Sequence, residues 1–317
     1  MSNNLSDAMD RKAAKIVWPG MRRWDIFEGP TRILPEVPFI GEFDLKNVVP
    51  NVLKADHHAD QFEVHLIYDG IRELWVDAPE NILSIRSGFG IILQPSQWHG
   101  GAMDAQYPAW YNSIRFKIPI GKAATLPGVS LRQIAKIRQT LERVETPIFK
   151  FSSVLGNSLR RLLDEHRQRD RGMEVAARGA FLEFLAWLQR DLLRLQDTGS
   201  VNKTTSEPSA QIKNSLTYLE ENLGTSFSVE NMAEAAGLSP SRFRRLFHSQ
   251  MGLSPHDYLA RRRVELSKPL LRTGKKSVTE VAMDMGFASA AHFALVFRQF
   301  VGMAPSQWRN RSKADNE

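Results

Sequence analysis

Three arginines lie close together on one short segment of this sequence, at Arg242, Arg244 and Arg245. A guanidinium group can donate two parallel hydrogen bonds to guanine O6 and N7, or to a phosphate group. Phe243 and Phe247 have the spacing of a buried helical stripe, which would leave the arginines on the opposite, exposed face. The segment therefore predicts a helix that contacts DNA.

A second segment, fifty residues later, repeats the apolar positions at Phe293 and Phe297 but differs on its exposed face. The outward positions that we expect to contact DNA there are Ala290, Ala291, His292 and Leu295. Alanine and leucine cannot form bidentate hydrogen bonds with bases, although they can contact thymine methyl groups. We therefore expect the first helix to specify the DNA sequence and the second mostly to position the protein.

The other residues that could do chemistry lie nearer the N-terminus, where His58 and Glu63 are followed by Trp98 and His99. Two imidazoles and a carboxylate on adjacent strands can hold a metal ion. His57 and His58 are adjacent, however, so in a strand they point to opposite faces, and three ligands remain at most. The same side chains also suit an organic molecule. We expect an effector site formed by His58, Glu63, Trp98 and His99, with no metal and no other cofactor; core packing remains the alternative for Trp98.

The elements that must position the arginines form a repeat in the last third of the chain. The pattern from Ser228 to Gly237 recurs 49 positions later, from Ser277 to Gly286. Each copy starts with a serine that can cap a helix, and reaches a glycine suited to a left-handed turn before a second apolar helix. Two copies of a helix–turn–helix unit explain the repeat, and such units place a helix in a DNA groove.

With this spacing, residues 209–310 resemble the two-unit helix–turn–helix domain of the AraC/XylS family of bacterial transcription regulators. The residues that carry the resemblance are Ala233, Gly237, Ser239, Pro240, Phe243, Leu246, Phe247, Gly252, Pro255 and Tyr258, then Val278, Val281, Ala282, Gly286, Phe287, Phe293, Phe297, Gly302, Pro305 and Trp308. The resemblance implies base contacts from Ser241, Arg244 and Arg245 in the first unit and from the second exposed face described above. Arg242 belongs to the same exposed surface of the first unit.

The connection between the two units, residues 255–271, is typical of one long helix that holds them at a fixed separation. It carries Arg261, Arg262 and Arg263, for which a solvated face is the alternative interpretation. Pro269 departs from the family pattern. A proline inside a helix removes one backbone hydrogen bond and costs about 3 kcal/mol, so we expect a kink or an early end there.

More weakly, the N-terminal part resembles the cupin-type barrel that precedes the DNA-binding unit in many regulators of this family. The resemblance implies a ligand-responsive regulator, most often an activator, that controls genes for the use of a small metabolite such as a sugar. Its implied partners are double-stranded DNA, a small-molecule effector and RNA polymerase. A homodimer is expected because dimers suit the reading of paired DNA half-sites.

The expected fold is multidomain α+β: an N-terminal cupin-like β-barrel plus a helical hairpin, and a C-terminal all-α domain with two helix–turn–helix units. The expected divisions are a cupin-like effector-sensing β domain at 1–120, a helical hairpin for dimerisation at 121–196, a linker at 197–208 and the DNA-binding domain at 209–317. The hairpin has two apolar stripes, Val154, Leu155, Leu159, Leu162 and Leu163, then Phe181, Phe184, Leu185, Leu188, Leu192 and Leu195. Burial of both stripes against the β domain is the alternative to a dimer interface.

The composition supports these assignments. The net charge is +7, and residues 209–317 contribute +5 of it, as expected for a partner with a phosphate backbone. The chain has no cysteine, no apolar run of membrane-spanning length and no secretory signal, so we expect a cytoplasmic protein without membrane contact. We do not expect an enzyme. The alternatives are a cupin-type oxygenase or isomerase with an intact metal triad, and an architectural DNA binder without an effector.

Overall fold

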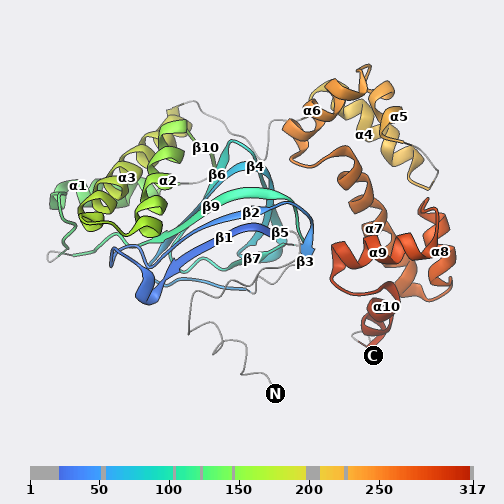
Figure 1. Cartoon of the computed structure of the whole chain (residues 1–317), viewed down its shortest axis with the longest axis horizontal. Coiled ribbons are helices and arrows are strands. Elements are labelled where there is room, and N and C mark those ends of the chain that lie inside the picture. Colours follow the sequence, from blue (N-terminus) through green and yellow to red (C-terminus); the bar gives the residue numbers. More distant parts are fainter. Residues whose placement is uncertain are drawn as a thin grey trace.

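The computed structural model describes residues 21–50, 55–102, 105–121, 124–144, 147–197, 208–224 and 228–314. Two regions are visible in Figure 1, a sheet covered on one side by helices and a separate group of helices formed by the last third of the chain. The expected linker at 197–208 lies outside the described residues except for its two end positions. No helix within the described ranges is long and apolar enough to cross a membrane.

The N-terminal region is built on antiparallel strands. Its main sheet has the order β1-β2-β9-β4-β6-β10, with β5 and β7 also paired to β4, and β3 pairs separately with β8. The strands are β1 (Met21–Glu28), β2 (Phe39–Leu45), β3 (Val49–Pro50), β4 (Phe62–Val76), β5 (Ala78–Arg86), β6 (Phe89–Leu93), β7 (His99–Gly101), β8 (Ala105–Gln106), β9 (Ala109–Phe116) and β10 (Ile148–Lys150).

This sheet-rich region was expected, but a closed barrel is not confirmed. The strands at the two ends of the order, β1 and β10, do not pair with each other in the part of the chain that the structure describes. The sheet bends along β4 instead. The first half of β4 pairs with β6 and β9, and its second half with β5 and β7. Gly70 stands between the halves with φ of +77°, and a Cβ atom there would lie 2.0 Å from the carbonyl oxygen of Pro108. Only glycine fits this crossing.

Three helices cover the sheet: α1 (Leu131–Glu142), α2 (Ser153–Gln168) and α3 (Met173–Asp197) (Figure 1). The apolar stripes of α2 and α3 belong to the same core as the strands. For example, the Phe116 ring of β9 lies 6.0 Å from the Phe181 ring and 5.7 Å from the Phe184 ring of α3. Burial against the strands therefore accounts for most of these stripes, and a dimerisation role for residues 121–196 stays a prediction.

The helical C-terminal region is confirmed. Its helices are α4 (Ala210–Asn222), α5 (Val229–Ala235), α6 (Pro240–Met251), α7 (Pro255–Thr273), α8 (Val278–Asp284), α9 (Ala290–Val301) and α10 (Pro305–Ala314). The pairs α5–α6 and α8–α9 are the two repeated units. Gly237 and Gly286 take the turn in each unit, with φ of +65° and +71°, which a side chain would strain. Four rings form the repeated buried skeleton, Phe243, Phe247, Phe293 and Phe297.

Helix α7 connects the two units and continues through Pro269 to Thr273, so the expected early end is wrong. Pro269 lies on the exposed side of α7, whereas Val264 and Leu271 are fully buried on the other side. This tertiary packing stabilises the helix despite the missing backbone donor, because helices in proteins gain most of their stability from a buried face.

Candidate functional site

The arginine-rich face of α6 is exposed, as its sequence pattern predicts. Helix α6 begins at Pro240 directly after Ser239, a favoured pair of residue types for a helix start. Its apolar residues are buried toward α4 and α5. The four residues expected to contact DNA are all exposed, at Ser241, Arg242, Arg244 and Arg245. Their surface carries three guanidinium groups within less than two helical turns.

One of these arginines is already engaged. Arg244 Nη2 lies 2.5 Å from Glu230 Oε1 of α5, and both side chains are 55% exposed. An exposed pair of this kind contributes little to stability, because water screens it and both side chains lose freedom. Contact between Arg244 and a DNA phosphate or base can therefore replace the contact with Glu230 at small cost.

The matching face of α9 is apolar. Ala291, His292 and Leu295 are exposed, and Ala290 is half-buried. Leu295 is 69% exposed, whereas the other leucines of the helical region are buried or half-buried. His292 is held at the start of the helix, where its backbone N–H donates to Ser289 Oγ. This face offers methyl groups and one imidazole rather than a row of positive charges.

The three arginines of α7 have defined partners instead of a solvated face. Arg261 pairs with Glu73 of β4, and Arg262 pairs with Glu220 of α4. Arg263 donates to the backbone carbonyl of Leu223, at the end of α4, and to that of Gly286, in the turn of the second unit. The triplet therefore ties α7 to three parts of the molecule.

A second group of polar residues surrounds Glu63 in the N-terminal region. Glu63 comes from β4, His99 starts β7, and His58 precedes β4. Oε2 of Glu63 lies 3.5 Å from His58 Nε2 and 3.2 Å from His99 Nε2. The backbone ladder between Asp56 and His99 brings the segment before β4 beside β7. Sequence reasoning thus chose three residues, His58, Glu63 and His99, that the fold brings together.

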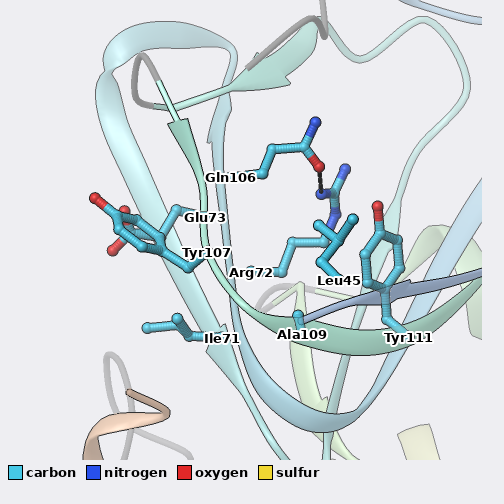
Figure 2. A pocket seen from close by; sticks show the side chains of 8 residues that line it. All are labelled: Leu45, Ile71, Arg72, Glu73, Gln106, Tyr107, Ala109 and Tyr111. Carbon is cyan, nitrogen blue, oxygen red and sulfur yellow. Dashed lines mark hydrogen bonds between the residues drawn. The ribbon is translucent and has the colours of Figure 1, made fainter. Parts of the chain in front are cut away.

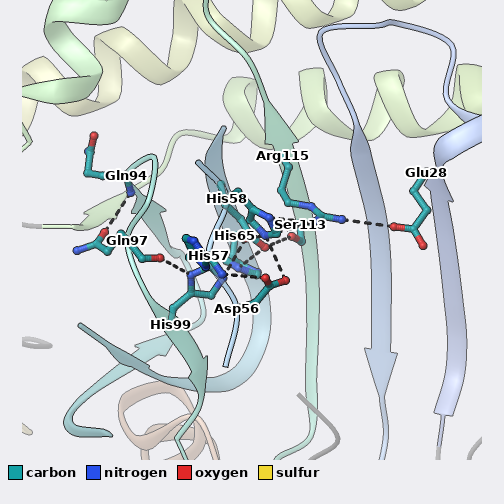
Figure 3. A network of polar contacts seen from close by, with 11 residues as sticks. Glu28, Asp56, His57, His58, His65, Gln94, Gln97, His99, Ser113 and Arg115 are labelled. Atoms are coloured by element: carbon teal, nitrogen blue, oxygen red, sulfur yellow. Dashed lines mark hydrogen bonds and ion pairs between the residues drawn. The ribbon is translucent and has the colours of Figure 1, made fainter. Parts of the chain in front are cut away.

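Other residues complete this cluster, and they were not predicted from the sequence. Glu63 Oε1 lies 3.1 Å from His65 Nε2 and accepts a hydrogen bond of 3.1 Å from the Ser113 hydroxyl. Arg115 Nη1 lies 3.1 Å from His58 Nε2. Figure 3 shows His58, His65, Ser113 and Arg115 gathered at one point of the sheet. The period of two in β4 was an available signal, because residues 63 and 65 share one face of a strand.

Trp98 does not join the cluster. Its side chain is 48% exposed, and its ring stacks on His57 with 4.1 Å between centroids. Trp98 and His57 therefore form a separate pair at the surface. Of the adjacent residues His57 and His58, only His58 pairs with Glu63.

The charges of the cluster are strongly coupled. Burial raises the pKa of Glu63, but the imidazoles of His58, His65 and His99 outweigh it and hold that pKa well below its usual range. Burial lowers the pKa of His99, and the Glu63 carboxylate reverses the effect, so its net pKa is raised. Burial dominates at His65, whose pKa is lowered. The carboxylate is therefore charged and faces imidazole nitrogens.

Two hollows are found in the described part of the protein, and neither lies at the cluster. One has about 10 Å³, no more than a water molecule occupies, and is lined by residues that include Arg72, Glu73, Gln106 and Tyr107. Figure 2 shows Arg72 and Gln106 pointing toward each other there, at 3.3 Å. The other lies beside α1. None of His58, Glu63 and His99 lines either hollow.

Comparison with known proteins identifies the helical region. Residues 232–311 match the family model described as a helix-turn-helix domain. A probable transcriptional regulator, LumQ of Photobacterium leiognathi, is 38% identical over 92 residues, which cover 29% of this chain and 37% of that protein. The HTH-type transcriptional activator RhaR of Enterobacter sp. (strain 638) is 35% identical over 112 residues, covering 35% of this chain and 40% of that protein.

Among solved structures, the DNA-binding domain of the global transcriptional factor AdpA, in complex with a target DNA, is 33% identical. The match covers 35% of this chain and 96% of that chain, with a TM-score of 0.32. The chain spans only 37% and 40% of the length of the two regulators. Both are named for transcription.

Proposed function

Because the C-terminal region of this chain is an AraC-type helix-turn-helix domain, we propose that the protein is a sequence-specific, DNA-binding regulator of transcription. One observation carries the proposal: two helix–turn–helix units stand on a common connecting helix, and each leaves one helix face exposed. The exposed face of α6 bears three arginines, which suit base edges and phosphates. The positive charge of residues 209–317 supports the same partner.

The two units have different roles in this proposal. Helix α6 specifies the DNA sequence through Arg242, Arg244 and Arg245, together with Ser241. Helix α9 positions the protein, using its N-terminus for phosphate and Ala290, Ala291, His292 and Leu295 for apolar or single contacts. Their contrasting chemistry supports the division, because bidentate base contacts require side chains such as arginine.

The proposed regulator is ligand-responsive, with the effector site at the cluster of His58, Glu63 and His99. Activation is proposed from the name of the RhaR relative, a transcriptional activator. Another relative is named an arabinose operon regulatory protein, but no contact of the described residues singles out a sugar. We therefore propose a small effector without assigning a sugar. A homodimer and a contact with RNA polymerase complete the proposal.

The direct test is selection of bound sequences from a pool of random double-stranded DNA by the purified full chain. The expected result is one enriched motif, bound at least 1,000-fold more tightly than scrambled DNA at the same salt concentration, about the lower end for specific binders. Base-by-base changes in the motif should then cost more on the half that contacts α6. No enrichment would contradict the proposal, and equal costs on both halves would contradict the division between α6 and α9.

A further inference from the structure

The cluster around Glu63 has the donor set of a metal centre. Two imidazoles and one carboxylate, from His58, His99 and Glu63, each offer one ligand atom, and these three atoms lie within 4.8 Å of one another. His58 and Glu63 belong to one short stretch of the chain, and the fold brings the distant His99 to them. Figure 3 shows His58, from the segment before β4, and His99, at the start of β7, approaching the same point.

The Glu63 carboxylate is held in place through Oε1, which leaves Oε2 as the ligand atom. Ser113 and His65 both contact Oε1 of Glu63, at 3.1 Å each. Oε2 is buried and meets no donor in hydrogen-bonding geometry among the described residues, although the imidazole nitrogens of His58 and His99 are its neighbours. A buried carboxylate oxygen without a hydrogen bond is costly, and a cation between these three atoms would satisfy it.

The distances fit one ion. Bonds from zinc to imidazole nitrogen and carboxylate oxygen are about 2.0–2.2 Å, so neighbouring ligand atoms lie about 2.9–3.5 Å apart. The two contacts of Glu63 Oε2, 3.5 Å to His58 and 3.2 Å to His99, fall in this range. The remaining separation, between the two imidazole nitrogens, is at most 4.8 Å.

His99 also presents the correct nitrogen, whereas His58 Nε2 must exchange its 3.1 Å contact with Arg115 Nη1 for the ion. His99 Nδ1 lies 3.0 Å from the backbone carbonyl oxygen of Gln97, so Nδ1 carries the proton and donates to it. That tautomer leaves the lone pair of Nε2 directed at Glu63. A backbone carbonyl that fixes a histidine in this way is the usual partner of a metal-bound imidazole.

From this geometry we propose that His58, Glu63 and His99 bind one divalent transition-metal ion. Imidazole and carboxylate ligands suit zinc, cobalt, nickel and iron rather than calcium or magnesium, which prefer oxygen donors alone. Three protein ligands leave a coordination position open on such an ion. Neither of the two hollows described above includes the cluster.

His57 supplies a matched control. It is adjacent to His58 in the chain, but its ring stacks on Trp98 rather than contacting Glu63. His57→Ala removes an imidazole from the same segment and should leave the metal site intact. Glu63→Gln and His99→Ala each remove one proposed ligand.

The test is titration of the full chain, stripped with a chelator, with Co²⁺ as the probe. Visible absorption of the bound ion, calorimetry and mass spectrometry of the intact complex report binding without any DNA. We expect one ion per chain in the wild type and in His57→Ala. In Glu63→Gln and His99→Ala we expect affinity to fall on the order of 100-fold or more. Bound ion should raise the thermal midpoint of the wild type but not of these two variants.

Absence of binding by the stripped wild type would overturn the proposal, as would binding that Glu63→Gln and His99→Ala leave unchanged. Circular dichroism of each variant separates loss of a ligand from loss of the fold, and His58→Gln replaces any variant that fails to fold. Since the readouts concern the N-terminal region, their failure leaves the DNA-binding proposal intact, and failure of DNA selection leaves the metal site intact.

Discussion

Arg261 of α7 and Glu73 of β4 form a bidentate ion pair that joins the helical region to the sheet. Both hydrogen bonds measure 3.0 Å, and the side chains are only 19% and 6% exposed. The guanidinium also lies 4.6 Å from the centre of the Tyr107 ring, in a cation–π contact. The pair is thus a buried link between residues that stand 188 positions apart in the sequence.

The surroundings of this pair are shared by both regions. Ile71, Val48 and Tyr107 of the N-terminal region pack in one apolar cluster with the second helix–turn–helix unit. Tyr107 and Phe300 of α9 have ring centroids 6.2 Å apart. A change in the sheet can therefore reach the connecting helix α7 and the helix α9 through direct contacts, which is what a ligand-responsive regulator requires.

The first prediction concerns this link. Glu73→Ala leaves the buried charge of Arg261 without its partner, which costs about 3–5 kcal/mol when one member of a buried pair is removed. Urea unfolding of the full chain should show that loss as a lower midpoint or as separate transitions for the two regions. The matched control is Glu220→Ala, which removes the partner of Arg262 at a more exposed site and should cost at most about 1 kcal/mol. Equal losses in the two variants would refute a special role for Arg261 and Glu73.

The second prediction concerns sequence reading by α6. Arg245→Ala, and separately Arg244→Ala, should weaken binding to the selected DNA motif by about 1–3 kcal/mol and relax the preference at one base position. Fluorescence anisotropy on the motif and on scrambled DNA at one salt concentration measures both effects. Arg171→Ala, which removes an exposed arginine from the turn between α2 and α3, is the charge control. If the loss is the same on scrambled DNA, the arginines contact phosphates only.

The third prediction separates folding from binding at α9. Leu295 is 69% exposed, so Leu295→Ala should change the free energy of unfolding by no more than about 0.5 kcal/mol, as at other surface positions. Its removal should nevertheless weaken binding to motifs that contain thymine opposite α9, because it deletes an apolar contact with a methyl group. Val175→Ala in α3, a residue 79% exposed, controls for the loss of exposed aliphatic surface. Unchanged DNA affinity would exclude Leu295 from the interface.

The helical region was predictable because its constraints are local and repeated. Serine caps, turn glycines such as Gly237 and Gly286, and buried phenylalanines recur at fixed spacing, and each acts within one helix–turn–helix unit. The same reasoning placed Arg244 and Arg245 on an exposed face. The low helix propensity of proline alone predicted an early end of the helix at Pro269. The helix continues because burial of the opposite side of α7 stabilises it.

The candidate sites were predictable only in part. Glu63 and His99 share a site because β4 and β7 are brought together, and their residue types signalled it. His65 and Ser113 were missed because neither type is distinctive alone, and strand register decides that they face Glu63. The pairing of Arg261 with Glu73 depends on how the two regions dock, so no pattern in either segment could have indicated it.

The fourth prediction uses a buried histidine that lies away from both sites. His166 of α2 is 1% exposed, donates from Nδ1 to the Leu162 carbonyl at 2.8 Å and accepts at Nε2 from the Ile33 N–H at 3.3 Å. Burial lowers its pKa in the folded protein, with a smaller contribution from Arg169. Both ring nitrogens are thus used in the neutral form, and protonation would replace the acceptor at Nε2 with a second donor.

The sign of the pH effect follows from that lowered pKa. The stabilising contribution of neutral His166 is fully present above its unfolded pKa of about 6.5 and is lost as pH falls through the lower folded pKa, by about 1.4 kcal/mol for each pKa unit of lowering. Urea unfolding of the wild type and of His166→Leu between pH 7.5 and about 4.5 measures it. The difference in unfolding free energy between the two proteins should shrink as the pH falls. A pH-independent difference for His166→Leu would show that the imidazole contributes by packing alone.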